Sequence, residues 1–149
     1  MKVRDLLKEK SRPVQTIAGN RSVDQAIALM AGQKASAVIV MENDRPVGIF
    51  AERDVCRCYL RNKSTALFET ALHNAMTDRL ITAGPEDEVS RVIAIMVQAD
   101  IKHLPVMAEN KIIGMLTLND LIERQLESLY AEIHQLQDYI EDLHEAGRD

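Results

Sequence analysis

Residues 114–120 read GMLTLND and residues 48–54 read GIFAERD, so one short phrase occurs twice, 66 positions apart. Each copy begins with a glycine, continues with two apolar residues and ends with an aspartate. The second copy has a threonine, Thr117, where the first has Ala51. An apolar run precedes each phrase and a helical pattern follows it, which predicts a strand-to-helix junction at both places.

The phrase belongs to a longer internal repeat. An ungapped alignment of residues 14–55 with residues 80–121 gives nine identical pairs, among them Gly48 with Gly114. Composition alone would give roughly two or three such pairs, and the apolar positions between them mostly agree as well. Two long units predict a duplicated small domain whose halves pack together.

Each copy predicts the same order of elements: strand, helix, strand, strand, helix. The first long helix of copy one begins with a serine followed three residues later by a glutamine, which is a capping box. The pairs Asn43-Asp44 and Glu109-Asn110 fall where a hairpin turn is expected, although neither is the favoured Asn-Gly. The strands are expected at 13–17, 35–43 and 45–50 and at 79–83, 102–110 and 111–117, and the helices at 22–33, 54–61, 88–99 and from 119 onward.

Composition excludes several classes of function. The chain has 149 residues, 46% of them hydrophobic, which suffices for one aliphatic core, and its net charge is −5. That charge disfavours nucleic acid and anionic membranes as partners. The first twelve residues contain no apolar stretch long enough for a secretory signal, so we expect a cytoplasmic protein.

The only two cysteines, Cys56 and Cys58, are separated by a single residue. Such close neighbours do not cross-link a fold, and neither a second pair nor matching histidines accompany them as a zinc site would require. Ordinary helix packing and exposure are therefore favoured over a redox or metal role.

The duplication, the element order and the phrase glycine-apolar-apolar-threonine-x-x-aspartate resemble a pair of CBS domains, named after cystathionine β-synthase. The resemblance covers roughly residues 8–128 and implies an α/β fold of tandem repeats, packed as a pseudo-twofold pair with two equivalent clefts. It places repeat 1, with an N-terminal helix, at 1–65, repeat 2 at 66–125 and a helical tail at 126–149. Such clefts commonly take adenosine-containing ligands: AMP, ADP, ATP, NAD or S-adenosylmethionine.

The resemblance also implies the site residues. Asp120 would bind the ribose, Thr117 the ribose or a phosphate, and Asn119 would lie near the phosphate. Each cleft borrows residues from the other repeat, so Thr117 and Asp120 would share a cleft with Ala35, Ser36 and Ala37. The other cleft would combine the residues Asp54, Arg53, Ile101, Lys102, His103 and Pro105.

The chemistry of a carboxylate in this place supports two interpretations. An ionised aspartate can accept two hydrogen bonds from a ribose diol, beside backbone N–H groups that favour a phosphate. Alternatively, Thr117 and Asp120 have capping-box spacing, which requires no ligand. Since Ala51 has lost the capping hydroxyl while Asp54 is retained, capping alone does not account for the aspartate, and ligand binding is favoured.

Two further side chains carry alternatives of their own. Arg53 could bind a phosphate bidentately, or pair with an acid on the surface. We expect the cleft holding Arg53 and Lys102 to prefer ligands with more phosphates. His103 is more typical of a partly exposed side chain than of a catalytic group, because no nucleophile or second carboxylate accompanies it in sequence.

The tail predicts a coiled coil. Its apolar residues recur at alternating steps of three and four, with isoleucine at two a positions and leucine at d positions, a pattern that favours a two-stranded parallel dimer. The alternative is a helix that packs its stripe on its own domain. The stripe comprises Ile122, Leu126, Leu129, Ile133, Leu136, Ile140 and Leu143.

Two classes of function remain. The preferred one is a non-enzymatic sensor, a homodimer that binds an adenine nucleotide and signals to an unidentified protein. No activated nucleophile, metal cluster or glycine-rich phosphate loop supports catalysis or a catalytic cofactor. The alternative is a structural dimerisation protein with vestigial clefts.

Overall fold

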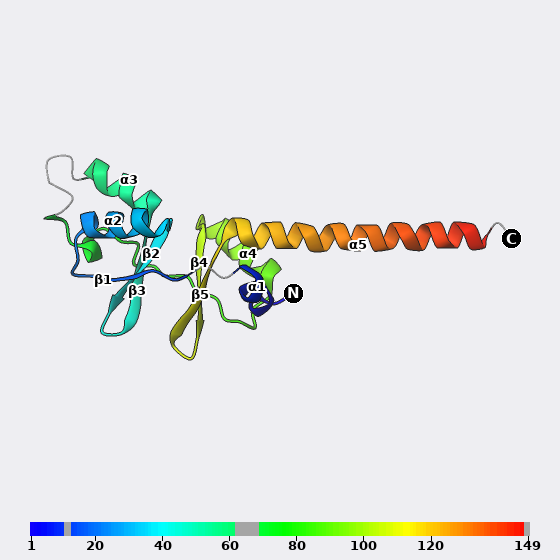
Figure 1. Ribbon diagram of the computed structural model, residues 1–149, viewed down its shortest axis with the longest axis horizontal. Coiled ribbons are helices and arrows are strands. Elements are labelled where there is room, and N and C mark those ends of the chain that lie inside the picture. Colours follow the sequence, from blue (N-terminus) through cyan, green and yellow to red (C-terminus); the bar gives the residue numbers. More distant parts are fainter. Residues whose placement is uncertain (11–12, 62–68, 148–149) are drawn as a thin grey trace.

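The structure is a computed structural model that describes residues 1–10, 13–61 and 69–147. It is a mixed α/β fold made of two similar halves followed by one long helix (Figure 1). The expected boundary at 65–66 between the repeats lies outside the described residues. Figure 1 shows the two β-hairpins side by side, with α2 and α3 beyond one and α4 and α1 beyond the other.

The first repeat is a three-stranded sheet with two helices. Strand β1 (Thr16–Ala18) runs parallel to β2 (Ala37–Glu42), which pairs antiparallel with β3 (Arg45–Ala51). Helix α2 (Val23–Gln33) begins with the predicted capping box, in which the Ser22 hydroxyl accepts from the backbone N–H of Gln25 and the Gln25 side chain accepts from that of Ser22. Helix α3 (Glu52–Arg61) follows β3 directly.

The second repeat has the same order with one difference. A short 3₁₀ turn, η2 (Leu72–Asn74), precedes α4 (Val89–Ala99), and β4 (His103–Ala108) pairs antiparallel with β5 (Lys111–Thr117). The strand predicted at 79–83 is wrong, because only Ala83 forms a parallel bridge, with Val106. The chain before it, at Thr77, pairs with Ile49 of the first repeat, so the residues between Thr77 and Ala83 cross from one sheet to the other.

The two predicted hairpin turns are confirmed. Asn43 and Asp44 have φ angles of 52° and 60°, and Glu109 and Asn110 have 51° and 64°. Consecutive left-handed residues match the right-handed twist of the flanking strands, and short polar side chains tolerate that conformation. The turn type therefore fixes the register of both hairpins.

Gly48 is required by a close approach of the segment between the repeats. A Cβ at this position would lie 2.6 Å from the Met76 sulfur and 2.7 Å from the Thr77 carbonyl oxygen. Thr77 and Ile49 exchange two backbone hydrogen bonds of 2.9 Å, so this segment extends the first sheet beyond β3. The glycine of the repeated phrase thus permits the contact between the sheet and the connection.

Helix α1 (Val3–Lys10) packs in the second repeat, although the sequence groups it with the first. Val3 and Leu6 are fully buried in the core formed by α4, β4, β5 and the start of α5. The backbone N–H of Val3 donates to the Asp87 carbonyl at 2.9 Å, and that of Val89 donates to the Met1 carbonyl at 3.0 Å. An amphipathic pattern identifies the apolar face of a helix and leaves its partner undetermined.

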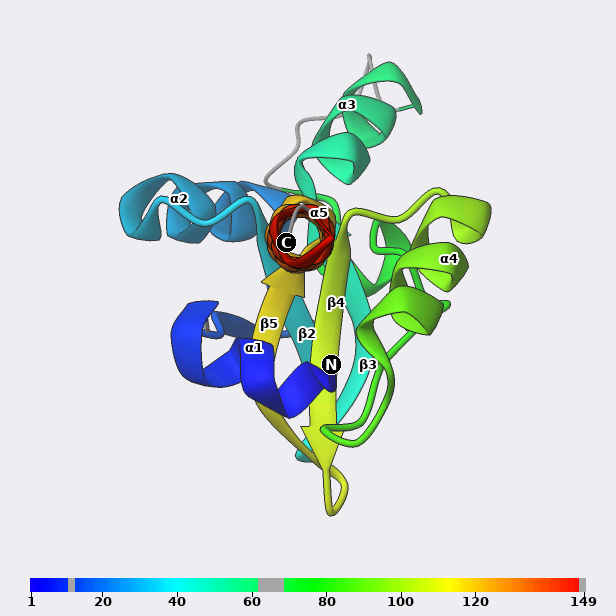
Figure 2. The same cartoon turned by 90° about the vertical axis from the view of Figure 1, so that its right-hand side faces the viewer.

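Helix α5 (Leu118–Ala146) begins in the second repeat and then projects away from it (Figure 1). Figure 2 looks along α5 from its C-terminal end and shows α2 and α4 on opposite sides of the projected helix, with the strands below it. Beyond Leu129 every described residue of the helix is exposed, so the stripe does not pack on its own domain. Among the described residues, no helix is both long and apolar enough to cross a membrane.

Candidate functional site

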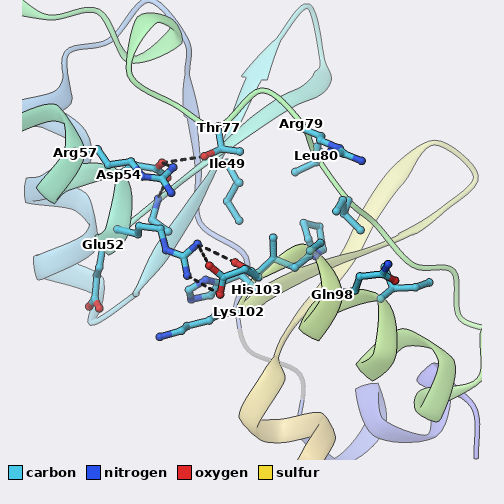
Figure 3. Close-up of a pocket in the computed structure, with 18 residues that line it drawn as sticks. Ile49, Glu52, Asp54, Arg57, Thr77, Arg79, Leu80, Gln98, Lys102 and His103 are labelled. Carbon is cyan, nitrogen blue, oxygen red and sulfur yellow. Dashed lines mark hydrogen bonds and ion pairs between the residues drawn. The ribbon is translucent and has the colours of Figure 1, made fainter. Parts of the chain in front are cut away.

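A cleft of about 680 Å³ lies between the two repeats. Its walls come from the β3–α3 junction, from the connecting segment and from the α4–β4 junction (Figure 3). It contains all six residues that the sequence assigned to the first cleft: Arg53, Asp54, Ile101, Lys102, His103 and Pro105. The predicted sharing of residues between repeats is therefore present in the geometry of this cleft.

Asp54 is the buried acid of the cleft, with 5% of its surface exposed. One carboxylate oxygen, Oδ2, accepts from the backbone N–H of Ala51 at 2.9 Å. The other, Oδ1, accepts from the Thr77 hydroxyl at 2.8 Å, and an Arg57 nitrogen lies 3.9 Å from it. The connecting segment thus supplies a hydroxyl donor to this carboxylate.

Asp120, the equivalent acid, is 4% exposed and lies in a complete capping box. Its N–H donates to the Thr117 hydroxyl at 3.2 Å, and its Oδ2 accepts from the Thr117 N–H at 3.3 Å. The capping interpretation of these two residues is therefore realised in the fold. Both repeats hold the aspartate against the first turn of a helix, where a carboxylate is favoured by the unsatisfied N–H groups.

Arg53 bridges the two repeats at the edge of the cleft. One guanidinium nitrogen donates to the Asp100 carbonyl at 2.8 Å and lies 3.3 Å from an Asp100 carboxylate oxygen. Asp100 ends α4 in the left-handed conformation with φ 54°. The alternative that Arg53 pairs with a surface acid is therefore correct in this structure.

The remaining charges of the cleft are mostly positive. Arg57, Arg79 and Lys102 join Arg53 around it, against the acids Glu52, Asp54 and Asp100. Within the described residues, the side chains of Arg79 and Lys102 form no hydrogen bond or ion pair, so both are available to an anion. For a protein of net charge −5, this is a local concentration of cations.

His103 contacts the other repeat directly. A ring nitrogen of His103 lies 2.7 Å from the Ser36 hydroxyl, in a partly buried hydrogen bond. Ser36 and His103 stand at the starts of β2 and β4, so this bond joins the two sheets where they meet. The expectation of a satisfied, partly exposed histidine agrees with this environment.

The residues assigned to the second cleft are not gathered in the same way. Ala35 and Ser36 line a hollow of about 550 Å³ together with residues of α2 and α3. Thr117, Asn119 and Asp120 lie at the start of α5 and line neither this hollow nor the first cleft. Ala37 is buried in β2. The two sites are thus unequal in the described part of the chain, because the residues assigned to the second do not line one common hollow.

Sequence reasoning missed several residues of the first cleft. Thr77, Arg79 and Leu80 come from the connecting segment, which no repeat alignment pairs with a site position. The repeat carries no signal for them, because their place in the cleft depends on the path of the connecting segment. For the cysteines, Cys58 is buried in the first core and Cys56 is exposed, as ordinary helix packing predicts.

Two α/β repeats that share a cleft define a class of tandem-repeat proteins, and comparison with known proteins identifies the family. The family model for the CBS domain matches residues 3–61 and 72–127. The chain therefore belongs to the CBS-domain family, with one match in each repeat.

Relatives agree with that assignment. CBS domain-containing protein YhcV of Bacillus subtilis is 25% identical over 116 residues, which cover 77% of this chain and 81% of YhcV. A Methanopyrus kandleri protein is 34% identical over 90 residues, but the match spans 59% of this chain and only 45% of that protein.

Solved structures share most of this arrangement. A protein with CBS domains from Burkholderia ambifaria has a TM-score of 0.78 at 28% identity, and the match covers 85% of this chain and 95% of that one. Two CBS proteins with ligands match at lower identity. One from Pyrobaculum aerophilum, complexed with AMP, has TM-score 0.70 and 19% identity over 80% of this chain and 89% of its own. The other holds 5′-methylthioadenosine and S-adenosylmethionine, with TM-score 0.71 and 22% identity over 86% and 97%. At these identities the likeness concerns the fold.

Proposed function

We propose that this chain is a non-enzymatic regulatory module whose first cleft binds an adenosine-containing ligand: AMP, ADP, ATP, NAD or S-adenosylmethionine. The observation that carries the proposal is the cleft itself, in which residues of the two repeats arrange a buried carboxylate and a set of cations around about 680 Å³. That volume falls in the usual range for small-molecule sites. AMP and S-adenosylmethionine in CBS proteins of the same fold support the ligand class.

The cleft offers a different surface for each part of such a ligand. Ile49, Leu80, Ile81 and Ile101 provide apolar walls suited to an adenine ring. Asp54 can accept from a ribose hydroxyl through the lone pairs that Ala51 and Thr77 leave available, because each carboxylate oxygen has two. A charge-assisted hydrogen bond of this kind contributes about 1.5–3 kcal/mol.

The cations favour ligands with several phosphates. Arg79 and Lys102 have no acidic partner among the described residues, and Arg53 could exchange Asp100 for a phosphate with a similar bidentate geometry. We therefore expect ATP to bind more tightly than AMP here. Equal affinities for the two nucleotides would contradict this part of the proposal.

Isothermal titration calorimetry tests the proposal. We expect one of the five ligands to bind the wild type and Asp54→Asn to weaken that binding at least tenfold, since it removes the charge and preserves the size. Asp138→Asn on the exposed part of α5 is the matched control and should bind as the wild type does. If none of the five ligands binds to the folded protein, the proposal is wrong.

The second candidate function is a dimerisation scaffold with vestigial clefts. The exposed apolar stripe of α5 favours it independently of any ligand. Calorimetry distinguishes the two candidate functions, because a scaffold would bind none of the five ligands. The oligomeric state of a scaffold would also be unaffected by Asp54→Asn. The sensor function, unlike the scaffold, also implies a downstream protein partner.

A further inference from the structure

Helix α5 presents an apolar face that its own domain leaves uncovered. From Leu126 to Leu143 the stripe residues are between 45% and 61% exposed, and the segment is about 27 Å long at 1.5 Å per residue. A monomeric protein rarely exposes so continuous an apolar surface unless it binds a partner. We propose that the partner is a second copy of this chain, paired through α5 in a parallel, in-register, two-stranded coiled coil.

The position of the domain leaves this face accessible. Leu121 is buried and Arg124, Gln125 and Ser128 are half-buried against the second repeat, with Arg124 3.2 Å from Glu9 of α1. In a coiled coil with 3.5 residues per turn, or about 103° per residue, the centre of that covered side lies roughly 130° around the axis from the apolar stripe. Two copies can therefore bring their stripes together while their globular parts point away from each other.

The residues of the seam favour two parallel strands. Counting from Leu126 as an a position, Ile133 and Ile140 are also at a, and Leu129, Leu136 and Leu143 are at d. β-branched residues at a with leucine at d are the combination that favours parallel dimers. Antiparallel pairing would instead place isoleucine against leucine in mixed layers.

The flanking positions contain no charge conflict. In a parallel dimer each g residue faces the e residue five positions later in the partner. Glu132 then meets the partner's Gln137, and Tyr139 meets the partner's His144. No pair of like charges is formed at the seam, so the partner can be an identical helix.

The tail is strongly acidic, so two paired tails repel each other to some extent. Residues 125–149 contain seven of the 23 acidic residues and one of the 18 basic ones, so the rest of the chain carries a small positive net charge. Most of these acids are at b, c and f, on the outside of the pair. In the dimer, the acids at these positions on one helix lie more than about 15 Å from those on the other helix. This separation exceeds the Debye length of about 8 Å at physiological salt. Packing therefore dominates, and the residual repulsion predicts that salt tightens the dimer.

Cysteine cross-linking of the full chain tests orientation and register. In a Cys56→Ser/Cys58→Ala background, Leu143→Cys places two thiols opposite each other only if the helices are parallel and in register. We expect quantitative disulfide formation from Leu143→Cys and none from Gln135→Cys, which points outward. Cross-linking only in mixtures of Leu126→Cys with Leu143→Cys would show antiparallel pairing and overturn the proposal.

Sedimentation equilibrium tests the affinity. Leu136→Glu should raise the dimer dissociation constant about 100-fold, because it buries two carboxylates at the seam, whereas Gln135→Glu should change it less than threefold. The dimer dissociation constant should be lower at about 0.5 M than at about 0.05 M NaCl, because added salt screens the repulsion between the tails. A wild-type monomer at high micromolar concentration, or a dimer that Leu136→Glu leaves unchanged, would overturn the proposal. These outcomes are independent of ligand binding.

Discussion

The Thr77 hydroxyl donates to Oδ1 of Asp54 at 2.8 Å, so a side chain from the connecting segment holds the aspartate of the first repeat. In the second repeat, the Thr117 hydroxyl instead accepts from the backbone N–H of Asp120 at 3.2 Å. The two equivalent aspartates are thus contacted by hydroxyls from different segments and in different roles. As a result, the first aspartate is tied to the connection between the repeats.

Thr77→Val should destabilise the protein by about 1–2 kcal/mol, because it leaves a buried carboxylate oxygen with one fewer donor and changes little volume. Urea denaturation measures the effect. Thr82→Val is the control, since Thr82 is exposed, and it should stay within about 0.5 kcal/mol of the wild type. Equal effects of the two substitutions would show that the Thr77 bond contributes nothing.

Gly48→Ala should destabilise by about 1–3 kcal/mol, because the new methyl group would overlap the Met76 sulfur and the Thr77 carbonyl oxygen. Gly32→Ala is a control with the opposite expected sign. Gly32 lies in α2, and a methyl group there would meet no atom within 4 Å, so alanine should stabilise by roughly 0.5–1 kcal/mol. Thermal unfolding of both variants checks the contrast.

Asp100→Asn should release Arg53 from its ion pair while asparagine tolerates the left-handed backbone of this position. The pair is largely exposed, so the stability should change by less than about 1 kcal/mol. If the proposed function is correct, ATP binding should become tighter, and AMP binding should change less. Calorimetry with both nucleotides measures the difference, and Arg53→Ala should have the reverse effect on ATP.

Thr117→Ala should destabilise by about 1 kcal/mol, because it removes the cap of α5. Thr117→Ser retains the hydroxyl and should be close to the wild type. Guanidinium denaturation followed by far-ultraviolet circular dichroism checks both. A Thr117→Ala protein as stable as the wild type would mean that the Asp120 half of the capping box suffices.

Glu86 predicts a pH dependence at the N-terminal helix. A hydrogen bond from Lys2 and the charges of Arg4 and Lys2 lower the pKa of Glu86 below its ordinary value of 4.5. A lowered pKa in the folded state means that the contribution is present above pH 4.5 and is lost as the pH falls through the folded value. The protection factor of the Val3 amide, which corrects for the intrinsic pH dependence of hydrogen exchange, should therefore be lower below that range, and Glu86→Gln should remove the difference.

Much of the fold could be predicted because the two repeats of the chain can be compared with each other. Matching Gly48 to Gly114 aligned the hairpins, and the polar pair at Asn43 and Asp44 located a turn. The strand at 79–83 failed because its residues cross between two sheets, which depends on the pairing of Thr77 with Ile49. Local sequence cannot encode a pairing partner that distant.

The candidate site was likewise predictable only in part. The resemblance to CBS pairs implied that Arg53, Lys102 and His103 share a cleft, and all three line the cleft between the repeats. Arg79 lies on the connecting segment, and its counterpart in the first repeat, Pro13, is not a site position. The Arg53–Asp100 pair could not be specified either, because which acid an exposed arginine reaches depends on the distance between elements in three dimensions.

The packing of α1 makes the second repeat a discontinuous domain. Its core takes Val3 and Leu6 from one end of the sequence and Leu104 and Leu116 from the other, and the whole first repeat is inserted between them. A cut anywhere between the repeats would therefore deprive the second half of a helix that its core needs. It also follows that a force applied to α1 would open the second half while the inserted first half kept its core. The order in which the two halves unfold under force therefore need not match their order in the sequence.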